Sequence, residues 1–280
     1  MFKKLSFSAL FFISSYAFAQ NPTQKIIVEK GQVKNSQDSM TVHISQDLMG
    51  QSVEFNISNI TTNVLEIKNI ADNKTTVTAT LTNVKSSFEG MGKSETYNSD
   101  KPEDKNSEMA KAYADKLNKP IDYVIDSKGK DISPEKPVVA KEGDDSNPLA
   151  GMMNMAGSAG NPAEIAFMIL PADSKKGSTW TDTLTNNGIK TSRTYIIKSI
   201  ENNIASITLL GVISGTTKIE MMGQEVNATM GGKVDGEITV DIKTGALIRN
   251  STVTQMDNSI EVMGMTVPVT GTVGYVVNYK

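Results

Sequence analysis

Residues 226–242 read VNATMGGKVDGEITVDI, and every second position from Val226 to Ile242 is apolar or glycine. The positions between them are polar or glycine. This period of two predicts a β-strand with one side in a core and the other in water. Because the stretch is far longer than the usual strand of about 5–6 residues, we expect one long antiparallel strand here.

The C-terminal residues repeat this alternation from Val267 to Tyr279. Glycines interrupt both stretches, at Gly231, Gly232, Gly236, Gly271 and Gly274. Glycine inside a strand marks a place where a long sheet bends. The sequence therefore predicts a mainly β protein, built as a long, strongly curved antiparallel sheet or half-barrel.

A phrase of acid, any residue, Met and Gly occurs four times, at 47–50, 89–92, 220–223 and 261–264. Each phrase is flanked by residues that alternate between polar and apolar. Glycine supplies the positive φ that a tight hairpin turn requires. We therefore expect hairpin tips at Gly50, Gly92, Gly223 and Gly264.

The two halves of the chain also resemble each other. Residues 64–73 have a counterpart in 195–203, where an apolar stretch ends in Asn202-Asn203 as the first ends in Asp72-Asn73. Residues 125–132 and 241–248 correspond in the same way, each with a glycine in a short turn. This pattern predicts two similar β halves, at residues 20–132 and 161–280.

Two segments break the β pattern, and we expect both to pack as short helices on the concave side of the sheet. Residues 107–118 combine good helix formers with an apolar face at helical spacing. The segment from Pro162 to Leu170 is almost wholly apolar and is bounded by Pro171. Residues 133–160, rich in Pro, Gly, Asp and Lys, are expected to form a flexible linker between the halves.

The first 19 residues have the features of a secretory signal peptide. Lys3 and Lys4 precede a short apolar run that closes with Ala17-Phe18-Ala19. We expect cleavage after Ala19 and export to the periplasm or the medium. No later apolar run reaches the ~20 residues of a membrane-spanning helix, so no transmembrane span is expected in the mature chain.

The composition argues against several classes of function. The chain has no Cys and one His, which disfavours a zinc site or a nucleophilic triad. His43 lies between Val42 and Ile44 on the polar side of a predicted strand, which favours a solvent-facing side chain. The basic residues are scattered and the net charge is −3, so a nucleic-acid partner is not expected. We therefore expect a protein that is not an enzyme and has no cofactor.

Methionine is the one candidate metal ligand. Met152, Met153 and Met155 form a cluster, and thioethers select Cu(I). Flexible Met side chains also fill gaps in cores and line adaptable apolar surfaces, which is the favoured interpretation. A copper binder and an enzyme stay as lesser alternatives.

The chain resembles a known family in three features: the Ala17-Phe18-Ala19-Gln20 cleavage region, the Met-Gly phrases, and the run from Leu170-Pro171 to Gly177-Ser178-Thr179-Trp180. This family consists of uncharacterised secreted proteins of Gram-negative bacteria, with a domain of unknown function, and the resemblance covers about residues 40–279. The family often has Gly-Asp-x-Trp where this chain has residues 177–180, so any role of that Asp would be absent here. The resemblance supplies no activity or ligand.

The preferred function is a non-catalytic exported envelope protein that binds an apolar ligand or a partner chain between sheet and helices. This expectation rests on an analogy between a curved sheet around an apolar helix and periplasmic lipid carriers. The expected contacts are Ile165, Phe167, Met168 and Trp180, although a lone Trp at a strand start is more often a core anchor. The alternative is a structural or protein-interaction module without a small ligand.

Overall fold

The structure is a computed structural model that describes residues 22–48, 51–134, 166–186, 188–221, 224–262 and 264–280. In these ranges the chain forms eleven β-strands, one 3₁₀ helix and one α-helix. The elements are β1 (Val33–Leu48), β2 (Gln51–Ala71), β3 (Lys74–Gly90), β4 (Lys93–Asn98), η1 (Pro102–Asn106), α1 (Glu108–Tyr113), β5 (Pro120–Ile125), β6 (Thr179–Asn186), β7 (Ile189–Glu201), β8 (Ile204–Met221), β9 (Gln224–Asp241), β10 (Leu247–Val262) and β11 (Met265–Tyr279).

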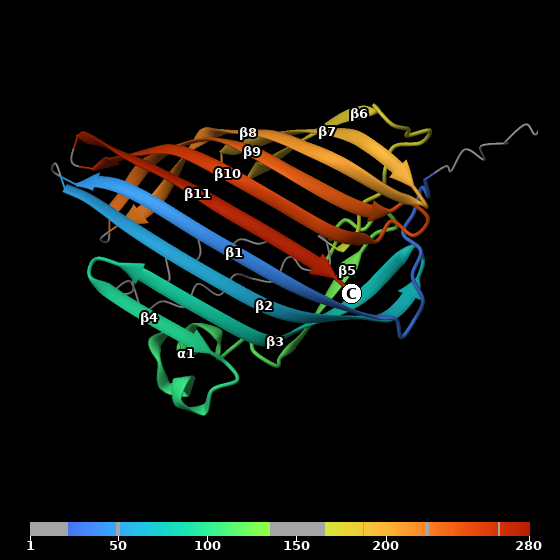
Figure 1. The fold of residues 1–280 in the computed structure, drawn as a ribbon, viewed down its shortest axis with the longest axis horizontal. Helices are drawn as coiled ribbons and strands as arrows, with labels where there is room; N and C mark the ends of the chain where they lie inside the picture. Colours follow the sequence, from blue (N-terminus) through green and yellow to red (C-terminus); the bar gives the residue numbers. More distant parts are fainter. Residues whose placement is uncertain (1–21, 49–50, 135–165, 187, 222–223, 263) are drawn as a thin grey trace, which may run out of the picture.

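All strands belong to one antiparallel sheet with the order β4-β3-β2-β1-β11-β10-β9-β8-β7-β6, and β5 pairs with β3 beside β4. Figure 1 shows the sheet curving so that β6, β7 and β8 bend back behind the front strands, which gives a trough. The two ends of the sheet, β6 and β4, do not pair with each other in the described residues. The predicted long, curved antiparallel sheet is confirmed, and the sheet is open.

The predicted alternation sets which side of the sheet is buried. On β9, Ile238 and Val240 are buried, whereas Glu237 and Asp235 on the alternate positions are exposed. Paired residues on neighbouring strands share a face, so the same side of the sheet is buried on β8, where Ile207 pairs with Ile238. We call this side the concave face. Its main core includes Leu65, Ile67, Val77, Ala79, Tyr195, Ile197, Ile207, Leu209, Ile238, Val240, Val277 and Tyr279.

A β-bulge in β3 keeps its buried side chains on the concave face along the whole strand. The register between β2 and β3 shifts between Thr62 and Asn63. Ala79 therefore faces the core before the shift, and Ser86 faces it after the shift. Without the bulge, an odd-numbered and an even-numbered residue would point to opposite faces. Their partners Leu65 and Asn59 lie on the same side of β2. β-Bulges increase the local bend and twist of a strand, which adds to the curvature of the sheet.

Glycine allows two strands to approach closely at the joint between the halves. At Gly271 on β11, an added Cβ would lie 2.5 Å from the carbonyl oxygen of His43 on β1. No larger residue fits here without moving the neighbouring backbone.

The equivalent turns of the two halves share a conformation. Asp72 and Asn73 have φ of 52° and 60°, and Asn202 and Asn203 have φ of 51° and 66°. Both turns are therefore two-residue hairpins with positive φ at both central residues, the geometry that matches strand twist. The duplication inferred from the sequence stays a prediction, and both halves contribute to one continuous sheet.

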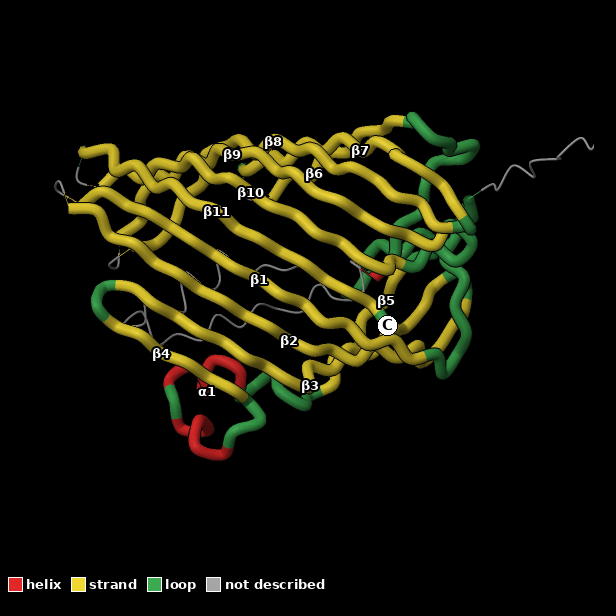
Figure 2. Tube along the Cα trace, in the orientation of Figure 1, coloured by secondary structure: helices red, strands yellow, loops and turns green. Residues whose placement is uncertain are grey.

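Two of the four predicted Met-Gly tips lie in the described residues. Gly92 has a φ of 71° and Gly264 a φ of 78°, as expected for hairpin tips. Gly50 and Gly223 lie outside the described residues. Figure 2 shows the β3–β4 tip at the left-hand end of the trough, opposite the end that carries the β2–β3 and β7–β8 turns.

Replacing Gly92 with Val is expected to lower the free energy of unfolding by about 1–2 kcal/mol, because a β-branched residue is strained at positive φ. No atom lies within 4 Å of the added Cβ, so the loss reports backbone strain alone. The matched control is Gly92→Asn, since Asn tolerates this conformation. Urea denaturation measures both, and equal stabilities for the two variants would contradict the turn geometry.

The first predicted helix is present but shorter than expected. α1 spans Glu108–Tyr113, and the side chain of Ser107 caps it by accepting the N–H of Ala110. Asn118 adopts a φ of 57° and donates its N–H to the carbonyl of Leu81, so the chain leaves the helix before residue 118. Met109, Ala110 and Tyr113 pack on Val84 and Tyr97, at the concave edge of β3 and β4.

The prediction of two short helices is wrong for the second one. Phe167 forms an antiparallel bridge with Ala246, and Met168 donates its N–H to Gly245. In residues 166–170, the described part of that segment, only Ala166 has a 3₁₀ conformation, and no α-helix forms there. An apolar run without periodicity does not distinguish a helix from an extended chain, and the 241–246 turn supplies the backbone partners. The predicted linker at 133–160 and the signal peptide at 1–19 lie almost wholly outside the described residues.

Candidate functional site

One end of the trough is filled by what we call the end plug: residues 22–32, 126–130, 166–170 and 241–246. The N-terminal segment crosses two hairpin turns, because Ile26 donates its N–H to Ser127 and Ile27 donates to Thr244, at 2.8 and 2.9 Å. Each turn carries a glycine with positive φ, Gly129 and Gly245. In both turns an Asp carboxylate accepts a backbone N–H two residues on. The plug is therefore ordered by backbone hydrogen bonds and packed apolar side chains.

Phe167 lies inside this plug. Its side chain is 7% exposed and belongs to the main core. An added Cβ at Gly129 would lie 2.7 Å from the Cβ of Phe167, and one at Gly245 would lie 2.4 Å from the Cδ1 of Ile169. The two turn glycines thus make room for the apolar segment 166–170, which explains why the segment needs no helix.

The structure separates the four predicted contact residues. Phe167 is core, and Met168 is half-buried against the same core. Trp180, on β6, stacks on Tyr195 with ring centroids 5.0 Å apart and an interplanar angle of 10°. Ile165 lies outside the described residues. Phe167 and Trp180 therefore serve first as packing residues, and the function suggested for them stays a prediction.

The corner around Trp180 is polar on its outer edge. Arg193 on β7 makes two hydrogen bonds to the carboxylate of Asp182 on β6, both at 2.7 Å. The hydroxyl of Tyr195 donates to the same carboxylate at 3.1 Å. Burial raises the pKa of Tyr195, so its hydroxyl keeps its proton and stays a donor. Asp182, Arg193 and Tyr195 thus form one hydrogen-bonded network.

A second group of polar residues lies on the concave face where the halves meet, and we call it the inner polar cluster: Asp38, Asn63, Asn250, Tyr275 and Tyr279. Asp38 on β1 faces Val277, which lies between Tyr275 and Tyr279 on β11. Val277 in turn pairs with Asn250 on β10. On the other side, Asn63 of β2 donates to Asp38 Oδ2 at 2.8 Å. Four adjacent strands thus bring these side chains together.

The environment of the inner polar cluster shifts several pKa values. Burial raises the pKa of Asp38 to about 6, although the neighbouring polar side chains of Ser36, Asn63 and Thr61 oppose the shift. Burial also raises the pKa of Tyr275 and of Tyr279, and the nearby charge of Asp38 adds to both shifts. Both phenols therefore stay protonated near neutral pH.

Lys34 lies on the same face, four residues before Asp38 on β1. Its Nζ is 5.7 Å from the ring centroid of Tyr279 and donates to the carbonyl of Leu247 at 3.5 Å. Burial lowers the pKa of Lys34, and the charge of Asp241 opposes this. In the described part of the chain, Asp38 itself forms no ion pair.

The sequence analysis missed this cluster. Tyr275 and Tyr279 are part of the alternating C-terminal strand, and in the sequence they look like ordinary residues of its apolar face. The usable signal is Asp38, which occupies the apolar side of the pattern Ser36, Asp38, Met40, Val42. A carboxylate on the core side of a strand is uncommon unless it is paired.

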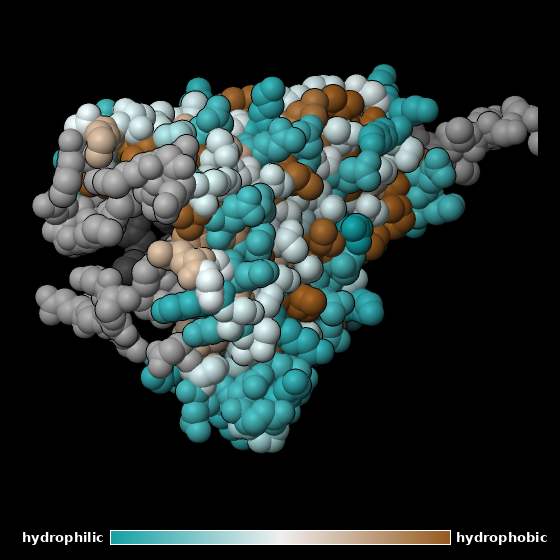
Figure 3. Space-filling view, turned by 60° about the vertical axis from the view of Figure 1, so that its left-hand side comes forward, coloured by the Kyte–Doolittle hydropathy of each residue, from teal (hydrophilic) through white to brown (hydrophobic). Residues whose placement is uncertain are grey.

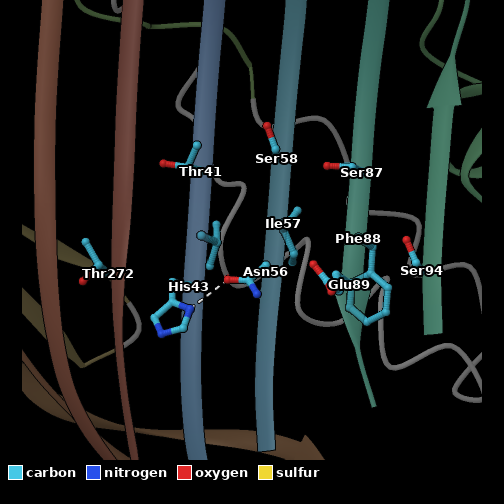
Figure 4. A pocket seen from close by; sticks show the side chains of 11 residues that line it. Thr41, His43, Asn56, Ile57, Ser58, Ser87, Phe88, Glu89, Ser94 and Thr272 are labelled. Carbon is cyan, nitrogen blue, oxygen red and sulfur yellow. Dashed lines mark hydrogen bonds between the residues drawn. The ribbon is translucent and has the colours of Figure 1, made fainter. Parts of the chain in front are cut away.

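The opposite, convex side carries a shallow hollow of about 360 Å³ across β1 to β4 (Figure 4). Its polar side chains point away from the core, and they are Thr41, His43, Asn56, Ser58, Ser87, Glu89, Ser94 and Thr272. His43 Nδ1 lies 2.8 Å from Asn56 Oδ1. His43 is exposed, as predicted, and Asn56 separates it from Glu89 in the strand register. The hollow therefore brings no carboxylate to His43.

The convex surface mixes apolar and hydrophilic residues. Figure 3 shows small brown areas separated by teal ones on the side in view. Val212, at 57% exposed, and Leu210, at 42%, are exposed apolar residues of β8 on the convex side. Such scattered exposure is normal for a protein surface.

Neither a metal site nor a membrane-spanning helix emerges from the described residues. No group of three or more His, Asp or Glu side chains there could hold a metal ion. No helix in those ranges has the length and apolar character needed to cross a membrane. The Met152, Met153 and Met155 cluster lies outside them, so copper binding stays a prediction.

With this geometry in view, the chain was compared with known proteins. Residues 161–247 match a family of unknown function (DUF6263). The match agrees with the predicted resemblance to a family of unknown function, and it falls on the second half of the chain rather than on residues 40–279. No curated protein matches the chain.

Similar solved structures share little sequence with this protein. A structure described as lipid–protein interactions in lipovitellin has a TM-score of 0.47 and 11% identity, and it covers 90% of this chain. This chain spans only 26% of that one. OccK5 (OpdH) of Pseudomonas aeruginosa has a TM-score of 0.26 and 5% identity, over 89% of this chain and 98% of that one. The translocator domain of the autotransporter NalP from Neisseria meningitidis has a TM-score of 0.21 and 6% identity, over 90% and 89%. At these TM-scores the likenesses establish neither a common fold nor a common function.

Proposed function

We propose that this protein is a non-catalytic, exported envelope protein that binds an apolar ligand against the concave face of its sheet. The export rests on the signal-like residues 1–19. The binding rests on one observation, the character of the concave face away from the end plug.

Beyond the main core, the concave face combines half-buried apolar side chains with glycines. Ile213 on β8 pairs with Gly232 on β9, and Val234 on β9 pairs with Gly211 on β8. Ile213 and Val234 are both half-buried. A glycine opposite each apolar residue leaves the surface without a side chain at that point. A concave surface lined mostly by apolar side chains is the usual character of a small-molecule site.

A catalytic function has less support. The polar groups near Trp180 are paired with one another, and His43 has Asn56 as its hydrogen-bond partner on the opposite side of the sheet. A general base needs a reactive partner within hydrogen-bond reach. We therefore propose a function in binding, without a chemical step.

The interaction-module alternative is favoured by one feature, the edge strand β6. In the described residues β6 pairs only with β7. Leu184 on β6 is 53% exposed. Unpaired edge strands accept extended segments of partner chains, so a partner chain is the second candidate ligand.

The test compares two neighbouring residues of β8 that point to opposite faces. Ile213→Asp places a carboxylate on the concave face, and Val212→Asp places one on the convex face. We expect Ile213→Asp to weaken the binding of diphenylhexatriene, a hydrocarbon fluorophore, by at least about tenfold, because a desolvated carboxylate is costly beside an apolar ligand. Val212→Asp is expected to bind like the wild type. Fluorescence titration measures the dissociation constants, and circular dichroism checks that both variants fold.

Two results would contradict the proposal. One is a wild-type protein that does not bind the fluorophore, and the other is an equal loss in both variants. If the wild type instead captures a defined extended peptide through β6, the interaction alternative gains the support that the carrier loses.

A further inference from the structure

Four oxygen atoms of the inner polar cluster are buried without a hydrogen-bond partner. They are Asp38 Oδ1, Asn250 Oδ1, and the hydroxyl oxygens of Tyr275 and Tyr279. Tyr279 as a whole is only 7% exposed. One further buried oxygen without a partner, Glu95 Oε2, belongs to β4 at the edge of the sheet. Four of the five such atoms in the described residues therefore belong to one cluster.

Such a concentration is unusual in a folded protein. Buried polar atoms are nearly always paired, and leaving one unpaired costs about 1–3 kcal/mol. Each of the four atoms comes from a side chain on the concave face, and the strand register places them around Val277. A ligand that supplies hydrogen-bond donors at this point would remove the cost at several of these atoms.

The chemistry of the four atoms selects the donor. Ionised Asp38 and the oxygen of Asn250 only accept hydrogen bonds, whereas the two phenols can donate or accept. A carboxylate ligand would pair with the phenols but leave Asp38 Oδ1 and Asn250 Oδ1 unpaired, and a hydroxyl ligand brings one donor only. A protonated amine brings three donors and no acceptor, and its charge matches the carboxylate of Asp38, which has no ion-pair partner among the described residues.

We propose that the inner polar cluster binds the protonated amine of an amphipathic ligand, with Asp38 as its counter-ion and the apolar chain of the ligand on the concave face. This rests on the proposed function, because the apolar chain occupies the same surface. The amine donates to Asp38 Oδ1, Asn250 Oδ1 and a phenol oxygen. Asn63 holds the other carboxylate oxygen, Oδ2, at 2.8 Å and so fixes the orientation of Asp38.

The proposal implies a specific pH dependence. An amine binds the ionised carboxylate, so its affinity should fall as the pH falls through the raised pKa of Asp38, about 6. The groups that face Asp38 do not titrate in this range: Tyr275 and Tyr279 on β11 have raised pKa values, and Asn63 and Thr61 on β2 and Asn250 on β10 are uncharged. Lys34 on β1 is a further charged group on this face, and Asp182 and Arg193, farther across the sheet, are paired with each other. An alkylamine keeps its proton throughout, since its pKa resembles that of Lys, about 10.4.

The experiment uses three ligands with the same chain: decylamine, decanol and decanoate. Each displaces diphenylhexatriene from the full-length protein, and the dissociation constants are compared at pH 8 and pH 5. We expect decylamine to bind at least tenfold tighter than decanol at pH 8, with decanoate weakest. At pH 5 the advantage of decylamine over decanol should shrink several-fold while the affinity for decanol is unchanged.

Two variants and one control localise the effect. Asp38→Asn, which is nearly isosteric, should reduce the ratio of decylamine to decanol affinity to about one. Tyr275→Phe should weaken decylamine about threefold and leave diphenylhexatriene unaffected. The control is Asp257→Asn, which removes an exposed carboxylate on the convex side of β10 and should behave as the wild type.

The outcomes separate this inference from the proposed function. If diphenylhexatriene binds but decanol and decylamine compete equally, or if Asp38→Asn keeps the preference for the amine, the amine site is refuted and the apolar carrier stands. If decanoate is preferred, the site binds an anion through Lys34, and this result also refutes the inference. If diphenylhexatriene does not bind, the proposed function itself fails.

Discussion

Replacing Phe167 with Ala is expected to lower the free energy of unfolding by about 3–5 kcal/mol, the usual cost of emptying a buried Phe site. The ring is 7% exposed and fills the end plug beside Gly129. The surrounding turns are held by backbone hydrogen bonds to Ile26, Ile27 and Met168, so they are not free to collapse into the cavity. Urea denaturation followed by circular dichroism measures the loss.

The matched control is Leu184→Ala, because Leu184 is 53% exposed on the edge strand β6. Its removal should change the free energy of unfolding by about 0.5 kcal/mol or less. A Phe167→Ala variant as stable as this control would show that the plug does not support the core. Reduced fluorophore binding at unchanged stability would instead indicate that Phe167 contacts the ligand, as the sequence analysis predicts.

Gly271→Val is expected to lower the free energy of unfolding by about 3 kcal/mol, at the upper end for overpacked sites. The added Cβ would lie 2.5 Å from the carbonyl oxygen of His43 and 3.3 Å from the Cα of Ile44, both backbone atoms of β1. The two strands must therefore separate at the joint between the halves. Thermal and urea unfolding measure the effect.

Thr270→Val is the control for the joint, because it places the same side chain one residue away, on the exposed side of β11. We expect a change within about 0.5 kcal/mol. If Gly271→Val is as stable as this control, β1 and β11 can separate at this point without a loss of stability, which contradicts the close approach of the two strands.

Local patterns in the sequence predicted most of the sheet. The alternation around Val226–Ile242 gave β9, and the Met-Gly phrases gave tips at Gly92 and Gly264, because strand faces and tight turns depend on neighbouring residues. The shared turns at Asp72-Asn73 and Asn202-Asn203 were visible for the same reason. Curvature followed from the strand glycines.

The features that depend on distant residues were not predictable in this way. Phe167 and Met168 pair with the 241–246 turn instead of continuing an α-helix, because that turn offers them backbone partners. The inner polar cluster joins Asp38, Asn250 and Tyr275, which meet only when β1, β11 and β10 are in register. No local pattern contains that register, so the candidate amine site could not be inferred from the sequence.

The pairing of β1 with β11 also has a kinetic consequence. It joins Ser36 to Tyr279, residues near opposite ends of the described chain, whereas β1–β4 and β6–β11 are meanders of sequential hairpins. Closing a long loop costs entropy before its contacts form, and such contacts slow folding. We expect each meander to assemble early and the β1–β11 ladder to form in the rate-limiting step, so that the inner polar cluster is assembled only after the slowest event in folding.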